Sequence, residues 1–240
     1  MNKTNWDQYY NSPAITASIT RKITTRKLTS LIRKFYTASL EDANILELGG
    51  ANSCFYDSLW FSFKPKTYTI IDNNEVGLER FKESHPESKN TFLVKQDLLN
   101  DRIILDQKYD IVFSVGLVEH FSPEETQKII RSHFNLLNPG GIVVIAFPIS
   151  TWLYRTARRV IEYFGLWAFP DERPLTFAEV NNEINKYAIS LYEVINWSII
   201  LTQGIVVSSN KGAQSNFLSG NVSTKKEKRC ANGMHQFQSQ

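Results

Sequence analysis

Residues 44–53 carry the sequence NILELGGANS. A short apolar run reaches the carboxylate of Glu47, and a glycine turn follows at Gly49 and Gly50 before the next segment begins. Glycines let the backbone turn sharply and approach a ligand with no Cβ in the way. This pattern predicts a buried strand whose end opens into a nucleotide-sized pocket. Its acidic end suits a ligand that offers hydroxyls or a cation better than one that offers phosphates.

Length and composition indicate an ordinary globular protein. The chain has 240 residues, of which 42% are hydrophobic and 21% charged, so one large domain with a sizeable core is expected. The net charge of +3 is too small for a dedicated nucleic-acid binder, so we expect no nucleic-acid partner. Cys54 and Cys230 lie far apart and form no metal-ligand pattern, so no metal is expected. Without a signal peptide or an apolar run of roughly 20 residues, the sequence favours a cytoplasmic protein.

Short β-rich runs alternate with helical patterns through the middle of the chain. Strands are predicted at 44–48, 67–71, 91–95, 109–114 and 141–147, and helices at 54–61, 75–83, 123–137 and 176–189. Ser122 followed by Pro123 is a typical helix start. This alternation predicts an α/β protein with a doubly wound, mostly parallel sheet. Two further runs, 191–197 and 199–207, lie too close for a crossover helix and predict an antiparallel C-terminal hairpin.

Three other regions flank this unit. Residues 1–40 are predicted to form an N-terminal lid segment. We expect helix within it, because between 13 and 40 apolar residues recur every three or four positions among basic ones. Its basic face is either solvated or a peripheral contact with anionic membrane. Residues 41–209 form the main domain, with an insertion at 149–175 that is rich in aromatic residues and arginine. Residues 210–240 are polar and are predicted to be a disordered tail.

Polar groups recur at the predicted strand ends, where a doubly wound sheet binds its ligands. Asp72 ends the second strand, about 20 residues beyond the glycines, where a carboxylate can take both hydroxyls of a ribose. Asp97 follows the third strand and is placed to accept an adenine amino group. The fourth strand ends at Ser114 and leads into Glu119 and His120. Each acid alone is compatible with a helix cap, whereas the ordered set points to one binding site.

With these motifs in place, the sequence resembles the class I S-adenosylmethionine-dependent methyltransferases over about 44–148. The family's first motif, acid-x-Gly-x-Gly-x-Gly, is matched by residues 47–53, with Ala51 and Ser53 at two of its glycine positions. The turn LLNPGG at 136–141 resembles the family's entry into its fifth strand. The resemblance implies a seven-stranded Rossmann-like sheet and S-adenosylmethionine as cofactor. It implies these cofactor-binding residues: Glu47, Gly49, Gly50, Ala51, Ser53, Asp72, Asn73, Asp97, Leu98, Ser114, Val115 and Gly116.

Two alternatives to a methyltransferase differ in how well they match the glycine turn. A nicotinamide-binding turn needs Gly-x-Gly-x-x-Gly, and the chain keeps only the first glycine of that spacing. A pyrophosphate would also lie poorly beside Glu47, so a dehydrogenase is disfavoured. A non-catalytic binding or scaffold protein with an eroded cofactor site remains the alternative, because Ala51 and Ser53 replace motif glycines.

Methyl transfer from a sulfonium requires that the acceptor atom be placed against the methyl group. For a hydroxyl acceptor a general base helps, and His120 is the best candidate, with Glu119 beside it. Trp6, Tyr9, Tyr10, Trp152 and Tyr154 offer stacking faces, and Arg155, Arg158 and Arg159 can pair with an anion. We therefore expect a small-molecule or glycan acceptor (a sugar, nucleotide-sugar or polysaccharide precursor) and O-methylation. The alternative is that Glu119 and His120 order the start of a helix or line the cofactor.

Overall fold

The computed structural model describes residues 3–11, 17–100, 103 and 105–210. Its seven strands are β1 (Asn44–Leu48), β2 (Thr67–Asp72), β3 (Thr91–Lys95), β4 (Tyr109–Val115), β5 (Leu137–Pro148), β6 (Ala188–Asn196) and β7 (Gln203–Asn210). Its helices are α1 (Trp6–Asn11), α2 (Ala17–Phe35), α3 (Tyr56–Phe63), α4 (Glu75–Ser84), the 3-10 turn η1 (Val118–His120), α5 (Pro123–Asn135), α6 (Trp152–Tyr163) and α7 (Phe177–Tyr187). The predicted tail lies outside these residues, except for Asn210.

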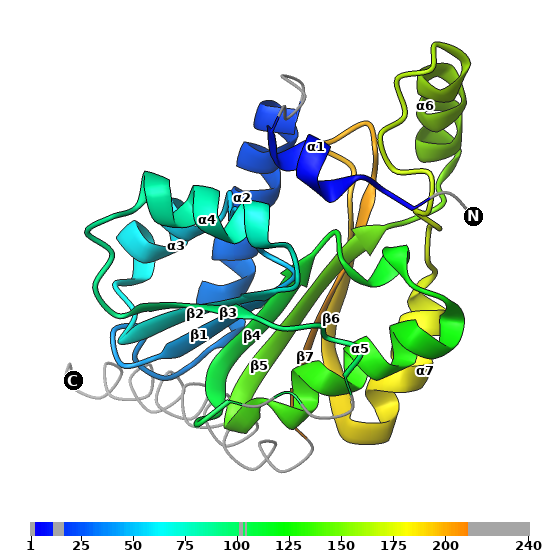
Figure 1. The fold of residues 1–240 in the computed structure, drawn as a ribbon. Helices are drawn as coiled ribbons and strands as arrows, with labels where there is room; N and C mark the ends of the chain where they lie inside the picture. Colours follow the sequence, from blue (N-terminus) through cyan, green and yellow to red (C-terminus); the bar gives the residue numbers. More distant parts are fainter. Residues whose placement is uncertain (1–2, 12–16, 101–102, 104, 211–240) are drawn as a thin grey trace, which may run out of the picture.

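All seven strands form one sheet in the order β3-β2-β1-β4-β5-β7-β6 (Figure 1). Strands β3, β2, β1, β4 and β5 pair in parallel, whereas β7 pairs antiparallel with both β5 and β6. The strand order reverses between β1 and β4, because β1 pairs with β2 on one side and β4 on the other. The doubly wound sheet and its antiparallel C-terminal pair are therefore confirmed.

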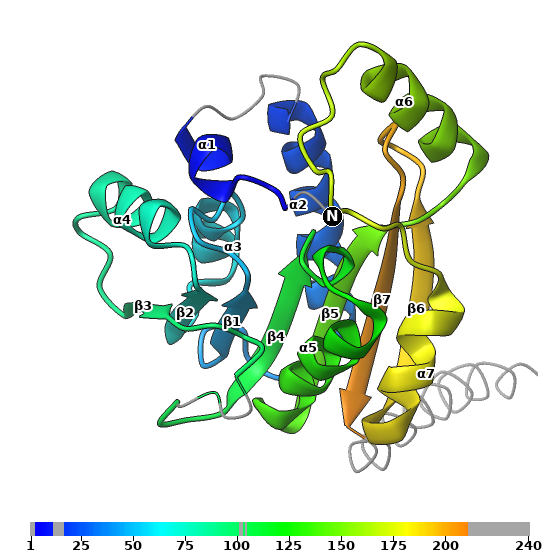
Figure 2. The ribbon, with the colours of Figure 1, turned by 45° about the vertical axis from the view of Figure 1, so that its right-hand side comes forward.

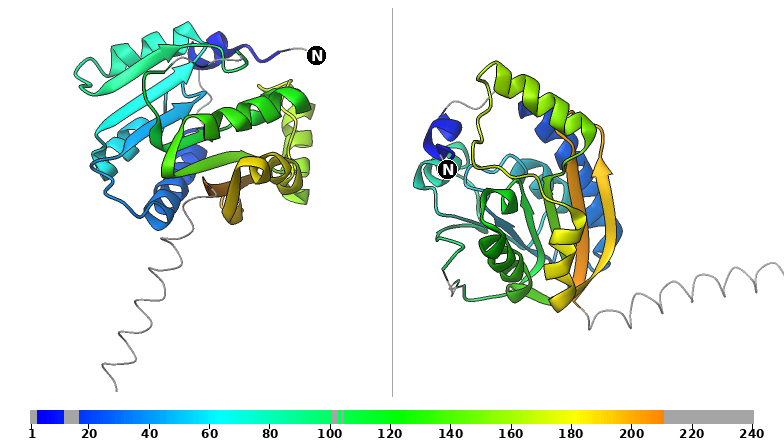
Figure 3. Two further views of the ribbon diagram at one scale, coloured as in Figure 1. Left: turned by 90° about the horizontal axis from the view of Figure 1, so that it is seen from below. Right: turned by 90° about the vertical axis from the view of Figure 1, so that its right-hand side faces the viewer.

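Helices cover both faces of the sheet, and each face has its own apolar core. One core joins the sheet to α2, α3 and α4, and the other joins it to α5 and α7. The right-hand view of Figure 3 shows α2 and α5 on opposite sides of the sheet. Helix α2 packs against one face of the sheet, since Leu28, Leu31 and Ile32 are buried while Lys22 and Arg26 are exposed. None of the described helices combines the length and hydropathy that crossing a bilayer requires.

Several predicted boundaries are wrong, chiefly around the last three strands. β5 begins at Leu137 and not at residue 141, because Leu137 already pairs with Tyr109 across an irregular register. The last strand begins at Gln203 and not at 199. The intervening turn is held by backbone and side-chain hydrogen bonds between Thr202 and Ile149. An apolar residue such as Ile199 is buried in that turn without belonging to a strand.

Helices α1 and α6 lie at the carboxyl end of the parallel strands. Figures 1 and 2 show α1 and α6 above this end, on either side of the ends of β4 and β5. Helix α1 packs against α4, where Asn74 donates a hydrogen bond to the Asp7 carboxylate at 2.6 Å. Parallel strands present their ligand-binding edge here. The N-terminal segment and the insertion thus lie over the carboxyl edge of the sheet.

Candidate active site

The glycine turn after β1 brings the backbone close to the ends of neighbouring strands. Gly49 has a φ of +72°, and a Cβ there would lie 2.5 Å from the Leu117 side chain. A Cβ on Gly50 would lie 2.6 Å from the Glu47 carboxyl carbon. Ala51, which stands at a motif glycine position, is buried and has a φ of 25°. Alanine therefore occupies this turn in a backbone conformation that glycine adopts more readily.

Glu47 holds the glycine turn in place through hydrogen bonds of its buried carboxylate. Its side chain is buried, and Oε2 accepts hydrogen bonds from the Ser53 hydroxyl and the Tyr68 hydroxyl, each at 2.6 Å. Burial raises the pKa of Glu47 to about 7, although these two hydrogen bonds oppose the rise. Ser53, at another motif glycine position, is thus used to hold the carboxylate. Direct contact of Glu47 or Ser53 with a cofactor stays a prediction.

Glu47 should make the stability of the fold depend on pH. A carboxyl whose folded pKa lies above its unfolded value binds more protons when folded, so its stabilisation is lost as pH rises from 4.5 through about 7. At about 1.4 kcal/mol per pKa unit, the loss is about 3 kcal/mol. We expect Glu47→Gln, which keeps the shape without the charge, to remove this loss. Urea unfolding of both proteins at pH 5 and pH 8 measures it, and an unchanged pH dependence in the variant would refute the assignment.

Asp72 lies at the end of β2 and faces the glycine turn. Its carboxylate accepts hydrogen bonds from the Ala51 amide at 3.0 Å and from the Asn74 amide at 2.8 Å. Burial raises the pKa of Asp72, and these backbone donors partly offset the rise. An ionised carboxylate has about four acceptor positions, so these bonds leave room for a further donor such as a ribose hydroxyl. Asn73, the next residue, is exposed.

The predicted residues after β3 and β4 are placed less uniformly. Asp97 is exposed and caps the Leu99 amide at 2.9 Å, whereas Leu98 is buried in the core beside α5. The Ser114 side chain is fully buried and bonded to His133 Nε2 at 2.9 Å, so it points away from any ligand. Gly116, with a φ of +71°, turns the chain from β4 toward η1. Only the backbone of this strand end is therefore available to a cofactor.

His120 is part of a network that the sequence did not reveal. Its Nδ1 lies 3.0 Å from Asp171 Oδ1, and Asp171 also accepts hydrogen bonds from the Thr4 amide and the Thr4 hydroxyl. Burial alone would raise the pKa of Asp171, but the bonds from Thr4 and His120 outweigh burial and lower it. Because the ionised carboxylate only accepts, Nδ1 carries the proton and Nε2 keeps its lone pair. Burial lowers the pKa of His120 despite Asp171, which favours the neutral ring.

Aromatic side chains enclose this histidine. The Trp6 ring lies 4.9 Å from the imidazole centroid and the Phe169 ring 5.8 Å from it, both edge to face. Trp6 comes from α1 and Phe169 from the insertion, so two distant segments meet over His120. Tyr9 joins them through its contact with Phe169 at 5.3 Å. The arrangement leaves the His120 side chain 8% exposed.

Other expected contacts of the insertion are not made. Trp152 is 66% exposed on α6, so it is not packed into this site, and Arg155 and Arg159 are exposed as well. Arg158 is committed to Glu162 at 2.7 Å, and the buried Tyr154 donates its hydroxyl to Glu172. The sequence patterns did not single out Asp171 and Glu172. The available signal for them is their charge, since they form an adjacent acidic pair in an arginine-rich insertion.

The residues present fit the cofactor that the sequence resemblance implies. A donor-accepting carboxylate at Asp72 stands beside a turn where Gly49 and Gly50 leave no side chain in the way. Tyr10 of α1 reaches the same place, since a Cβ added at Gly77 would lie 3.0 Å from its ring and 2.6 Å from Ala51. The carboxylates here can accept hydrogen bonds from ribose hydroxyls, and their negative charge suits the positive sulfonium of S-adenosylmethionine.

Comparison with known proteins finds one family model and several solved structures that are similar to this chain. Residues 45–141 match the family model described as a methyltransferase domain. No curated protein matches the sequence. A magnesium protoporphyrin IX methyltransferase from Synechocystis, solved with S-adenosylhomocysteine, is 14% identical with a TM-score of 0.64, covering 86% of this chain and 93% of that one. The N-methyltransferase NodS from Bradyrhizobium japonicum is 17% identical with a TM-score of 0.57, covering 78% and 87%.

A third structure agrees with these two. An S-adenosylmethionine-dependent methyltransferase from Clostridium acetobutylicum is 12% identical with a TM-score of 0.63, covering 80% of this chain and 92% of that one. At such low identity the solved structures establish the fold, and the family model establishes the domain. Residues 45–141 therefore match a methyltransferase domain, and the chain has the fold of these solved methyltransferases.

Proposed function

We propose that this protein transfers a methyl group from S-adenosylmethionine to a hydroxyl of a small-molecule or glycan acceptor, such as a sugar, nucleotide-sugar or polysaccharide precursor. The observation that carries the proposal is the hydrogen-bonded pair of His120 and Asp171 at the carboxyl edge of the sheet, covered by Trp6 and Phe169. A hydroxyl is a weak nucleophile at neutral pH and gains from a positioned base, typically by about 10²–10⁴-fold.

Each residue of this pair has a separate task. Asp171 accepts a hydrogen bond from Nδ1 of His120, which fixes the tautomer of the imidazole. Nε2 is then free to activate the acceptor hydroxyl as a general base. Trp6 and Phe169 exclude water from the imidazole. When bound, S-adenosylmethionine supplies an activated methyl group on its sulfonium. Asp72 would hold its ribose.

The surroundings of His120 support a sugar-like acceptor. Trp6, Tyr9 and Phe169 present aromatic surface, which packs well on the apolar face of a sugar ring. Arg21 of α2 donates to the Tyr9 hydroxyl at 2.7 Å and is half-buried, so a cation borders the same region. A base is of most use to an oxygen acceptor, which separates this proposal from the N-methylation named for NodS.

Helix α6 supports an acceptor held at a lipid surface. Its end and the following loop expose large apolar side chains, among them Tyr163 at 85%, Phe164 at 65% and Leu166 at 73%. Arg155 and Arg159 are exposed on the same helix. Aromatic and basic residues together suit the interface of an anionic membrane. A lipid-linked glycan precursor presented there would reach the carboxyl edge of the sheet.

Calorimetric titration of the purified chain with S-adenosylmethionine, S-adenosylhomocysteine and NAD tests the cofactor first. We expect binding of the first two and none of NAD. Transfer of a labelled methyl group is then measured to sugars, nucleotide-sugars and lipid-linked glycans in anionic vesicles, at low and high salt. Transfer to an oxygen supports the proposal, and transfer only to a nitrogen overturns it. Absence of cofactor binding would make the non-catalytic scaffold the better interpretation of Ala51 and Ser53.

A further inference from the structure

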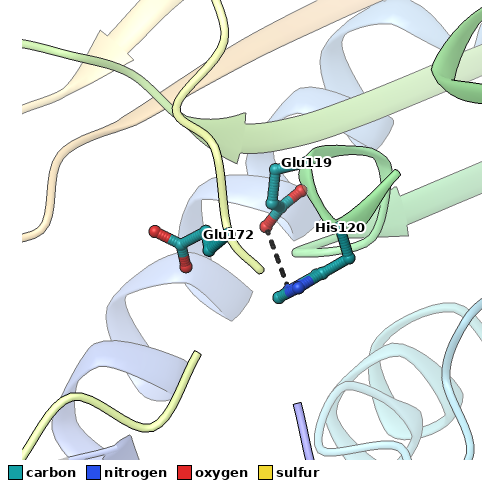
Figure 4. Close-up of side chains that lie close together, drawn as sticks. All are labelled: Glu119, His120 and Glu172. Carbon is teal, nitrogen blue, oxygen red and sulfur yellow. Dashed lines mark ion pairs between the residues drawn. The ribbon is translucent and has the colours of Figure 1, made fainter. Parts of the chain in front are cut away.

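Three potential ligand groups from two separate segments meet beside the proposed acceptor site. Glu119 and His120 belong to η1, and Glu172 lies in the loop between α6 and α7. One ligand atom from each residue can be chosen so that all three lie within 4.8 Å of one another. Figure 4 shows the Glu119 carboxylate turned toward the His120 ring, and Glu172 beside them with its carboxylate directed away from both. Ligand atoms about 2.0–2.2 Å from one cation lie at most about 4.4 Å apart, so these side chains would have to close slightly around an ion.

Glu119 is a buried carboxylate without a sufficient counter-charge. Its side chain is 2% exposed, and Oε2 has no hydrogen-bond partner among the residues that the structure describes. Within the same residues its one ion-pair contact is His120, whose Nε2 lies 4.0 Å from Oε1. The nearby Arg173 is instead paired with Glu179 at 2.7 Å. A buried carboxylate oxygen needs a partner, and a bound cation would supply one.

The imidazole is already arranged as a ligand. Asp171 accepts a hydrogen bond from Nδ1, so Nε2 keeps its lone pair and lies 4.0 Å from Glu119 Oε1. Metal-bound histidines usually donate their other nitrogen to a carboxylate in this way, which fixes the tautomer and the ring orientation. Glu172 is held similarly, because Tyr154 donates to its Oε1 and leaves Oε2 for a ligand. The supporting contacts of a metal site are therefore present around two of the three groups.

We propose that Glu119, His120 and Glu172 bind one divalent first-row transition-metal cation. One imidazole nitrogen and two carboxylates suit such a cation better than Ca²⁺, which prefers oxygen ligands alone. Three protein ligands leave positions open for a substrate oxygen. The site departs from the expectation that no metal is used, which rested on the cysteines, because here the ligands are carboxylates and a histidine.

Binding of the cation does not depend on the proposed function. The role that we give the cation in methyl transfer does rest on it. A hydroxyl that binds a metal ion loses its proton to solvent water more readily than a free hydroxyl. With the cation present, His120 Nε2 is a ligand, and activation of the acceptor passes from the base to the metal. The cation would also position the acceptor under Trp6 and Phe169.

Titration of the EDTA-treated full chain with Mn²⁺, followed by the loss of the free Mn²⁺ signal in electron paramagnetic resonance, tests binding. Mn²⁺ is the probe because it prefers carboxylates, so Cys54 and Cys230 compete little. We expect one equivalent to bind, and Glu119→Gln and Glu172→Gln each to weaken binding at least about tenfold. Two variants are used so that a folding defect in one leaves the test intact.

Matched controls are available on α4 and at its end. Glu83→Gln and His85→Asn change an exposed carboxylate and an imidazole outside the cluster, so Mn²⁺ binding should be unchanged. No binding, or binding that the two cluster variants do not weaken, overturns the cation site. Cofactor titration and methyl transfer are measured separately on the same samples. Mn²⁺ binding without any methyl transfer would leave the cation site standing and refute the proposed function instead.

Discussion

Replacing His120 with alanine is expected to lower kcat at least about a hundredfold while the Kd for S-adenosylmethionine stays within about twofold of wild type. The imidazole touches Trp6 and Phe169 and is bonded to Asp171, all on the acceptor side, and it makes no contact with Asp72. Its loss therefore removes acceptor activation and leaves the ribose contact in place. The measurement is steady-state methyl transfer together with calorimetric cofactor titration.

Asp171→Asn separates activation from packing at the same place. Asparagine keeps the size of the side chain but no longer fixes the Nδ1 proton by charge, so kcat should fall about tenfold or more with cofactor affinity unchanged.

Turnover of the His120→Ala variant close to wild type would return His120 to a structural role in η1. The expected loss is the same whether Nε2 takes the proton or holds a cation, and the Mn²⁺ titration distinguishes these two routes.

Asp72→Ala is expected to weaken S-adenosylmethionine binding at least about tenfold, which corresponds to about 1.4 kcal/mol. Hydrogen bonds to an ionised carboxylate are about twice as strong as those between neutral groups. The substitution also frees the Ala51 and Asn74 amides, which the carboxylate holds at 3.0 and 2.8 Å. The glycine turn would then lose part of its support, which adds to the effect.

Two further variants make this result interpretable. Asp72→Asn keeps one acceptor oxygen and the volume of the side chain, so its affinity should lie between those of wild type and Asp72→Ala. Asp57→Ala removes an exposed carboxylate from α3 and should not change binding. Thermal unfolding of each variant shows whether the turn has folded. Unchanged affinity in a folded Asp72→Ala protein would refute the ribose assignment.

Local sequence determined the parallel half of this protein. The β1 and β3 bounds agree with their predictions, and the Ser122 capping box starts α5 where Pro123 indicated. These elements are specified by short apolar runs, caps and glycine turns, which act within a few residues. The order of acids at successive strand ends was equally legible. It pointed to the class I fold because each acid lies at or near the end of its own strand, as Glu47 does in β1 and Asp72 in β2.

Only the tertiary structure decided which residues surround His120 at the proposed acceptor site. Thr4 and Asp171 are 167 residues apart in the chain, yet they bond to each other and hold His120. Glu172 comes to Glu119 by the same folding of the insertion over the sheet. No periodicity or spacing encodes such contacts, because they depend on how two segments pack after the sheet has formed. The sequence thus determined the strand ends with the glycine turn and Asp72, and the docking of the N-terminal segment against the insertion determined the surroundings of His120.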